Sequence, residues 1–255
     1  LVIQAMSGLM SVTGFPDGPP TAVGDSICDV TTGMFAAWGI TTALAGRAQT
    51  GRGQHIDVAM LDSMFSMLLT VLAKRLYAGA EPGRVGNRHP ITYPVDCFRA
   101  KDGHVVMVAI SDAAFAKLMQ AIGRPGLVGD PRFKRNTDRS ANEGELRAIL
   151  QEWMTFRTRD EIQKALDAVD VPCGPVWSIA DVAASEHIKA RGMILDPGHP
   201  KLAAAPLVRQ PVKFGLETPD TARAPLLGEH TDAVLRDVLG LGTDEIETLR
   251  RDRVI

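Results

Sequence analysis

The chain has 255 residues, of which 45% are hydrophobic and 23% are charged, and its formal net charge is −2. This length and composition suit one large globular domain or two smaller ones. The nearly balanced charge gives no support for nucleic acid or an acidic membrane as a partner, and aromatic residues, at 5%, offer no platform for stacking bases. No apolar run approaches the ~20 residues of a membrane span, so we expect neither nucleic acid nor a membrane as a partner.

The first 80 residues are predicted to form α/β layers that are part of a large domain, because helices, turns and a short strand alternate there. The expected order is a helix over 3–12, a loop over 15–24, a long helix over 29–47, a turn over 50–53, a strand over 55–60 and an apolar helix over 61–77. Residues 81–94 are rich in glycine, proline and polar side chains, and we interpret them as a crossover linker.

Beyond the linker the pattern is typical of a smaller α+β domain, predicted over 95–195. A β-hairpin is expected with Lys101-Asp102-Gly103 at its turn, and helices are expected over 112–122, 143–155 and 159–169. Thr158 with Glu161, and Ser178 with Asp181, fit capping boxes. Residues 196–255 are expected to return to the large domain, with an extended segment over 202–224 and closing helices over 228–239 and 243–253.

Three cysteines, Cys28, Cys97 and Cys173, are far apart and form no Cys-x-x-Cys pair. We therefore expect free thiols in a reducing compartment, the cytoplasm. The first ten residues, LVIQAMSGLM, lack a basic region and an initiating methionine, so they do not resemble a signal peptide, and we interpret them as the middle of a longer sequence.

The candidate catalytic residue is Asp29, which follows a proline- and glycine-rich loop at the predicted start of an apolar helix. A helix N-terminus has unpaired N–H groups and a partial positive charge, so it stabilises a carboxylate as the anion. From the pattern alone a plain helix cap is the more common role for such an aspartate. Asp25 competes both as cap and as nucleophile, and the Cys28 thiol is a further candidate, although a free cysteine is commonly a small buried hydrophobe.

The segment resembles the active-site region of the class III CoA-transferases, the carnitine and bile-acid CoA-transferase family, which includes formyl-CoA transferases and α-methylacyl-CoA racemases. The matching motifs are Gly18-Pro19-Pro20, Asp29, Thr32-Gly33-Met34, Ala36-Ala37, Thr50-Gly51-Arg52-Gly53-Gln54, Ile56-Asp57-Val58, Asp62-Ser63, Val171-Pro-Cys-Gly-Pro-Val176 with Trp177, Arg191-Gly192-Met193 and Pro225-Leu-Leu-Gly-Glu-His-Thr231. The resemblance covers essentially all of the chain. It implies that Asp29, rather than Asp25, is the catalytic aspartate.

The resemblance also implies a fold class, an activity and partners. The fold would be part of a Rossmann-like large domain plus a smaller α+β domain, with the N-terminal part of the family's large domain not present in this chain. The activity would be CoA transfer from an acyl-CoA to a small carboxylic acid through an aspartyl anhydride and an aspartyl-CoA thioester. Coenzyme A would be a substrate, no resident cofactor is expected, and family members form interlocked homodimers.

The segment Gly86-Asn87-Arg88-His89 is either a polar crossover loop or, as the resemblance implies, a substrate-binding lid over the active site. Arg88 would pair with a substrate carboxylate and His89 would line the pocket. The six histidines show no metal-ligand spacing, and no metal is expected. Two alternatives to CoA transfer stay open: a racemase-like isomerase, in which Asp29 would exchange an α-proton, and a truncated or decayed member without activity.

Overall fold

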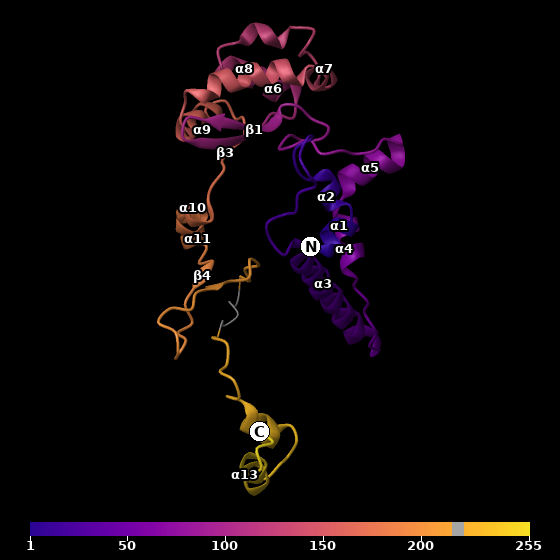
Figure 1. Ribbon diagram of the computed structural model, residues 1–255, viewed down its shortest axis with the longest axis vertical. Helices are drawn as coiled ribbons and strands as arrows, with labels where there is room; N and C mark the ends of the chain where they lie inside the picture. Colours follow the sequence, from indigo (N-terminus) through magenta and orange to yellow (C-terminus); the bar gives the residue numbers. More distant parts are fainter. Residues whose placement is uncertain (216–221) are drawn as a thin grey trace. The chain divides into compact units, whose positions relative to one another are not determined.

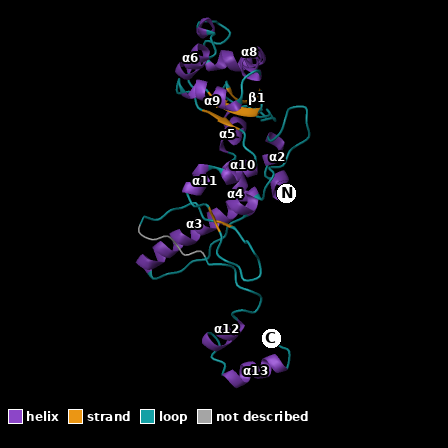
Figure 2. Ribbon diagram, turned by 90° about the vertical axis from the view of Figure 1, so that its left-hand side faces the viewer, coloured by secondary structure: helices purple, strands orange, loops and turns teal. Residues whose placement is uncertain are grey.

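The computed structural model describes residues 1–215 and 222–255, and the chain divides into two compact units, Leu1–Val176 and Trp177–Ile255 (Figures 1 and 2). The first unit contains an N-terminal helical part, a linker and the smaller domain with its three-stranded sheet. The domain boundaries expected at residues 80, 94 and 195 stay predictions.

The N-terminal part consists of five helices, and α1 and α3 both pack against α4. Their bounds are Val2–Met6 for α1, Leu9–Val12 for α2, Ile27–Thr50 for α3, Met60–Met67 for α4 and Leu69–Ala78 for α5. The helix expected over 3–12 is therefore interrupted, because Gly8 adopts a left-handed conformation at φ +88°. The helix expected over 61–77 is likewise divided at Leu68, where ψ is 32°.

The prediction of a strand over 55–60 is wrong. The residues before α4 are extended but pair with no described segment, and α4 already begins at Met60. A strand needs a hydrogen-bonded neighbour, and residues 1–94, all described, contain no other strand to supply one. The mixed α/β character is observed, whereas the Rossmann-like layering of the large domain stays a prediction.

Helix α3 is long, apolar and largely exposed. Only Cys28 and Thr31 among its 24 residues are buried, and Trp38 is 69% exposed. Its mean hydropathy over an 18-residue window is 1.2, with 11% of that window buried. This corrects the expectation that no apolar stretch approaches the length of a membrane span. By length and composition alone α3 could cross a membrane, and the core helices of soluble proteins pass the same test.

The smaller domain is built on an antiparallel sheet whose strands lie in the order β1-β2-β3. Strand β1 is Val95–Ala100, β2 is Gly103–Val108 and β3 is Cys173–Pro175. Val95 pairs with Val108 and Ala100 with Gly103, so Lys101 and Asp102 form the turn. This confirms the predicted β-hairpin.

Helices pack beside this sheet and enclose the hydrophobic core (Figure 1). They are α6 (Asp112–Ala121), a 3-10 turn η1 (Pro125–Val128), α7 (Asn136–Ala141), α8 (Glu143–Thr155) and α9 (Arg159–Asp167). The three predicted helices correspond to α6, α8 and α9. The core includes Phe98, Val105, Met107, Phe115, Leu118, Leu146, Leu150 and Ile162, all at most 1% exposed.

The second unit begins with two short helices, α10 (Ile179–Ala184) and α11 (Glu186–Ala190). A two-stranded sheet of β4 (Ile194–Leu195) and β5 (Leu207–Val208) follows, and α12 (Thr231–Asp237) and α13 (Thr243–Arg251) close the chain. Both predicted capping boxes are confirmed, at Thr158 before α9 and at Ser178 before α10. The predicted extended segment over 202–224 lies partly outside the described residues, at 216–221.

Candidate active site

Asp29 is the third residue of α3 and the only acidic residue in its first turn. Its side chain is exposed, and no described residue donates a hydrogen bond to its carboxylate or forms an ion pair with it. It therefore makes no capping contact. The N-cap residue is Ser26, whose side chain makes no capping hydrogen bond either, and Asp25 lies just before it: its Oδ1 accepts from the Ser26 N–H at 2.6 Å and its carbonyl from the Ile27 N–H at 2.8 Å.

Two backbone donors lie next to this carboxylate. The first turn of a helix leaves its N–H groups without intrahelical partners. The N–H of Val30 is satisfied by the Ser26 carbonyl at 3.0 Å, whereas those of Cys28 and Asp29 have no partner in the described part of the chain. Unpaired N–H groups beside a carboxylate are suited to hold an oxyanion that develops there.

The thiol of Cys28 lies on the opposite, buried side of this turn. Cys28 is 3% exposed, and its carbonyl accepts a hydrogen bond from the Thr32 hydroxyl at 2.7 Å. Reactive cysteines are partly exposed. Of the two neighbouring candidates, the carboxylate is the group that a substrate can reach.

Gly86 joins the linker to the loop that precedes Asp29. Its N–H donates to the Gly14 carbonyl at 2.9 Å, and its φ is +68°. A Cβ at this position would lie 2.9 Å from Cδ1 of Phe15, so the approach requires glycine. The first residue of the predicted lid thus contacts the segment that leads to Asp29.

Arg84 strengthens this junction. Its guanidinium donates to three backbone carbonyls of that loop: those of Phe15 at 3.1 Å, Pro16 at 3.3 Å and Gly18 at 2.7 Å. The glycine- and proline-rich loop, which has little regular structure, is therefore held by a side chain almost 70 residues away in sequence.

Arg88 and His89, by contrast, make their contacts with the smaller domain and with the end of the linker that leads to it. Arg88 Nε lies 2.8 Å from Glu143 Oε2 at the start of α8. His89 Nδ1 accepts from the N–H groups of Ile91 at 3.3 Å and Thr92 at 3.1 Å, which places the proton of a neutral ring on Nε2.

No hydrogen bond or ion pair among the described residues joins the four predicted lid residues directly to Asp29, and Asn87 is exposed without a partner in the same part of the chain. The structure therefore unites Gly86 with the loop before Asp29 but leaves Arg88 and His89 on the other side of the linker. Their substrate-binding roles stay predictions.

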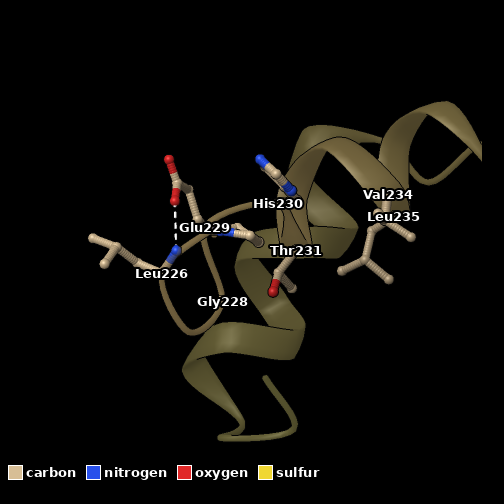
Figure 3. Close-up of a pocket in the computed structure, with 8 residues that line it drawn as sticks. Leu226, Gly228, Glu229, His230, Thr231, Val234 and Leu235 are labelled. Carbon is tan, nitrogen blue, oxygen red and sulfur yellow. Dashed lines mark hydrogen bonds between the residues drawn. The ribbon is translucent and has the colours of Figure 1, made fainter. Parts of the chain in front are cut away.

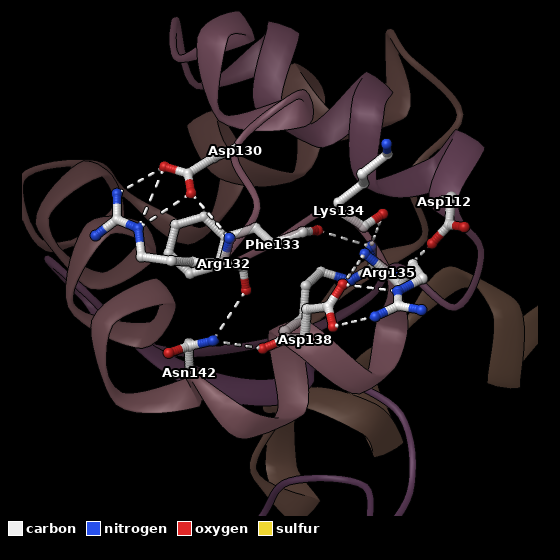
Figure 4. A network of polar contacts seen from close by, with 9 residues as sticks. Asp112, Asp130, Arg132, Phe133, Lys134, Arg135, Asp138 and Asn142 are labelled. Atoms are coloured by element: carbon white, nitrogen blue, oxygen red, sulfur yellow. Dashed lines mark hydrogen bonds and ion pairs between the residues drawn. The ribbon is translucent and has the colours of Figure 1, made fainter.

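The far end of the linker is anchored by α7. Tyr93 donates its N–H to Asn136 Oδ1 at 3.0 Å, and its carbonyl accepts from Arg139 Nε at 2.9 Å. Arg139 is fully buried, and its guanidinium also donates to the Phe133 carbonyl at 3.1 Å and to Asp112 Oδ1 at 2.7 Å. Figure 4 shows the side of this polar network that includes Phe133 and Asp112.

A second buried charge lies beside the linker's end. Asp96 is 2% exposed, accepts from the Cys97 N–H at 2.6 Å and pairs with Arg147. Burial raises the pKa of the Asp96 carboxyl, and the Cys97 N–H and Arg147 offset only part of that rise. Burial also raises the pKa of Tyr93. The side chains of Asp96 and Tyr93 support the structure of the linker and are too enclosed to act on a substrate.

The second unit carries its own hollow of about 390 Å³, lined by the predicted motif over 225–231 and the start of α12 (Figure 3). Glu229 accepts from the Leu226 N–H at 2.6 Å and pairs with Arg223. The hydrogen bonds from Arg223, first, and from that N–H lower the pKa of Glu229 to about 2. The motif thus forms a tight turn that begins a helix.

Comparison with known proteins gives this geometry a family. The model of "CoA-transferase family III" matches residues 1–231. The chain belongs to CoA-transferase family III. The acetyl-CoA:oxalate CoA-transferase of Acetobacter aceti is 38% identical over 239 residues, covering 92% of this chain and 60% of the relative. The succinyl-CoA:mesaconate CoA-transferase of Haloarcula hispanica is 36% identical, covering 97% of this chain and 63% of the relative.

Solved structures of the family agree. A CAIB/BAIF family protein from Brucella suis superposes with a TM-score of 0.77 at 36% identity, covering 92% of this chain and 61% of that one. The orthorhombic form of Rv3272 from Mycobacterium tuberculosis gives a TM-score of 0.79 at 27% identity, covering 91% and 62%. This family III chain therefore spans about three fifths of the length of these relatives.

Sequence reasoning identified Asp29 and Gly86 but missed several side chains that organise their surroundings, namely Gln4, Arg84, Glu143 and Arg139. Each acts on a backbone or side chain at least 19 residues away, except for the contacts of Arg139 with the Phe133 and Lys134 carbonyls. Their only signal in the sequence is a polar residue within an otherwise apolar or loop-rich stretch, which does not name its partner.

Proposed function

We propose that this protein is a CoA-transferase that moves CoA from an acyl-CoA donor to a carboxylic acid acceptor, with Asp29 as the nucleophile. The observation that carries the proposal is the exposed Asp29 carboxylate in the first turn of α3, which, like the two N–H groups beside it, has no partner among residues 1–215 and 222–255. The relatives' names supply the reaction class, since each is called a CoA-transferase.

The chemistry needs no proton transfer to or from Asp29. A carboxylate oxygen attacks the thioester carbonyl carbon, the C–S bond breaks, and a mixed anhydride and CoA thiolate result. The thiolate then attacks the aspartyl carbonyl of Asp29 and releases the donor acid, which leaves an aspartyl-CoA thioester. The acceptor carboxylate repeats these two steps in reverse order, so that new acyl-CoA leaves and the Asp29 carboxylate is regenerated.

Four features of the chain would support this sequence of steps. The partial positive charge of the α3 N-terminus lies beside the Asp29 carboxylate, and the N–H groups of Cys28 and Asp29 stabilise the oxyanion of each tetrahedral intermediate. Holding the carboxylate against a bound thioester supplies an effective concentration on the order of 10⁵–10⁸ M. Residues 86–89 would act as a lid that excludes water, because anhydrides and thioesters hydrolyse.

The substrates follow from the same reasoning. The named relatives act on oxalate and mesaconate, which are small dicarboxylic acids. We propose an acceptor of that class, with its carboxylate bound by Arg88 and with His89 lining the pocket. Coenzyme A is a substrate, and no resident cofactor takes part. We also propose an interlocked homodimer in the cytoplasm, where the three free thiols stay reduced.

The test is covalent trapping on the natural full-length protein. The protein is incubated with a panel of acyl-CoAs, quenched with hydroxylamine or borohydride, and its peptides are mapped by mass spectrometry. Modification is expected on Asp29, absent in Asp29→Asn and retained in the matched control Asp25→Asn. Demonstrated CoA binding with an unmodified Asp29 would refute the mechanism and favour a racemase-like reaction.

A further inference from the structure

The segment immediately before α3 is held by a buried glutamine. Gln4 of α1 is 3% exposed. Its Nε2 donates to the carbonyls of Val23 at 3.4 Å and Asp25 at 3.3 Å, and its Oε1 accepts from the Val23 N–H at 2.9 Å. A single side chain therefore replaces the ladder of hydrogen bonds that this extended segment lacks.

Both halves of the Gln4 amide are used. Its NH₂ group provides two donors and its carbonyl oxygen the acceptor, a combination that only glutamine and asparagine side chains offer. The Val23 N–H has no other partner among the described residues. Because an unpaired buried polar group is costly, the arrangement fixes the position of residues 23–25 against α1.

This fixation extends to α3. The Asp25 carbonyl that Gln4 binds also accepts from the Ile27 N–H, at 2.8 Å, and Ile27 is the first residue of the helix. Hydrogen bonds therefore connect Gln4 through Val23 and Asp25 to Ile27, which lies two residues before Asp29. Arg84 holds the earlier half of the same loop, at residues 15–18, so the loop is fixed from both ends.

We infer that Gln4 is a positioning residue for Asp29: its buried amide sets where the first turn of α3 lies, and with it the attacking carboxylate and the two unpaired N–H groups. This inference rests on the proposed function of Asp29. Gln4 itself touches no reacting atom. It acts through the backbone of residues 23–27.

The inference predicts a separation between acyl-CoA binding and reaction. Gln4→Leu removes all three hydrogen bonds. Gln4→Glu keeps the acceptor but turns a second oxygen toward the Val23 and Asp25 carbonyls, which repels them. Displacement of a reacting group by about 1 Å can cost on the order of 10²-fold in rate. Both variants are therefore expected to slow adduct formation at Asp29 by roughly that factor, with little change in acyl-CoA affinity.

The experiment measures three quantities in the natural full-length protein: the rate of Asp29 adduct formation by quenched flow, acyl-CoA affinity by calorimetry, and amide hydrogen exchange at Val23. The matched control is Gln49→Glu, the same change at an exposed position of α3. Slower adduct formation with retained affinity and faster Val23 exchange, in both Gln4 variants and not in the control, is the expected result.

Two outcomes separate this inference from the proposed function. A folded Gln4→Leu protein that forms the adduct at the wild-type rate overturns the inference and leaves the role of Asp29 intact. A wild-type protein that forms no adduct overturns the proposed function. In that case Val23 exchange still tests the structural part, since unchanged protection in Gln4→Leu would show that the amide does not fix this segment.

Discussion

The buried guanidinium of Arg139 gives the sharpest prediction for stability. Arg139→Met removes the donors that satisfy the carbonyls of Tyr93 and Phe133, two residues that are 1% and 0% exposed. Each orphaned buried acceptor costs about 1–3 kcal/mol, so the two together cost roughly 2–6 kcal/mol. The other two partners, Asp112 with a 68% exposed side chain and the exposed Lys134, regain water instead.

Two further effects narrow the expected loss in the free energy of unfolding. Arg139 lies over the Phe115 ring at 4.6 Å, a contact that methionine largely preserves through its thioether. Removing a buried charge also removes its desolvation cost, which offsets part of the loss. We therefore expect the free energy of unfolding of the smaller domain to fall by about 2–4 kcal/mol.

Urea denaturation followed by circular dichroism measures this loss. The matched control is Arg135→Met, because Arg135 is a neighbouring arginine whose side chain is 73% exposed and pairs with Asp138 at 2.9 Å. An exposed pair contributes at most about 1 kcal/mol. Equal midpoints for the Arg139 and Arg135 variants would refute the reasoning that unsatisfied buried carbonyls dominate.

Three other predictions concern single groups. Gly86→Ala should cost more stability than Gly51→Ala, since both have φ near +70° but only the first Cβ meets an aromatic ring, at 2.9 Å; urea midpoints compare them. Hydrogen bonds from the backbone and side chain of Thr158 lower the pKa of Glu161, so the stability that they contribute is present above pH 4.5 and is lost in stronger acid. The difference in Tm between wild type and Glu161→Gln should therefore shrink as the pH falls, and a constant difference would contradict this. Burial raises the pKa of Cys173 to about 11, so iodoacetamide should modify it far more slowly at pH 8 than a free thiol, as mass spectrometry would show.

The features that sequence predicted well are those with local causes. The turn at Lys101 and Asp102 and the caps at Thr158 and Ser178 each depend on a few adjacent residues, and all are observed. Helices α6, α8 and α9 also have a clear apolar face. Consistency within a short window was enough to place them.

The features that sequence could not predict depend on distant partners. An extended segment at 55–59 has the composition of a strand, but its state depends on whether another strand lies beside it. The division of the apolar helix at Leu68 likewise shows no proline or glycine in the sequence. Within the site, Asp29 was identified from its position and the family motifs, whereas its lack of a partner in the described part of the chain is a fact of three-dimensional structure.

The two arginines of the linker, Arg84 and Arg88, have different kinds of hydrogen-bond partner. Arg84 is committed to three neutral carbonyls and has no carboxylate partner among the described residues, so a substrate anion gains little by displacing it from the loop. Arg88 already binds a carboxylate, that of Glu143, in a pair whose side chains are 28% and 38% exposed. In the proposed role of Arg88, an acceptor carboxylate would take the place of Glu143, whose Oε2 atom is buried beside the guanidinium. The two arginines, four residues apart, therefore differ in their partners: Arg84 holds the loop before Asp29 through neutral carbonyls, whereas Arg88 faces a carboxylate, as its proposed role requires.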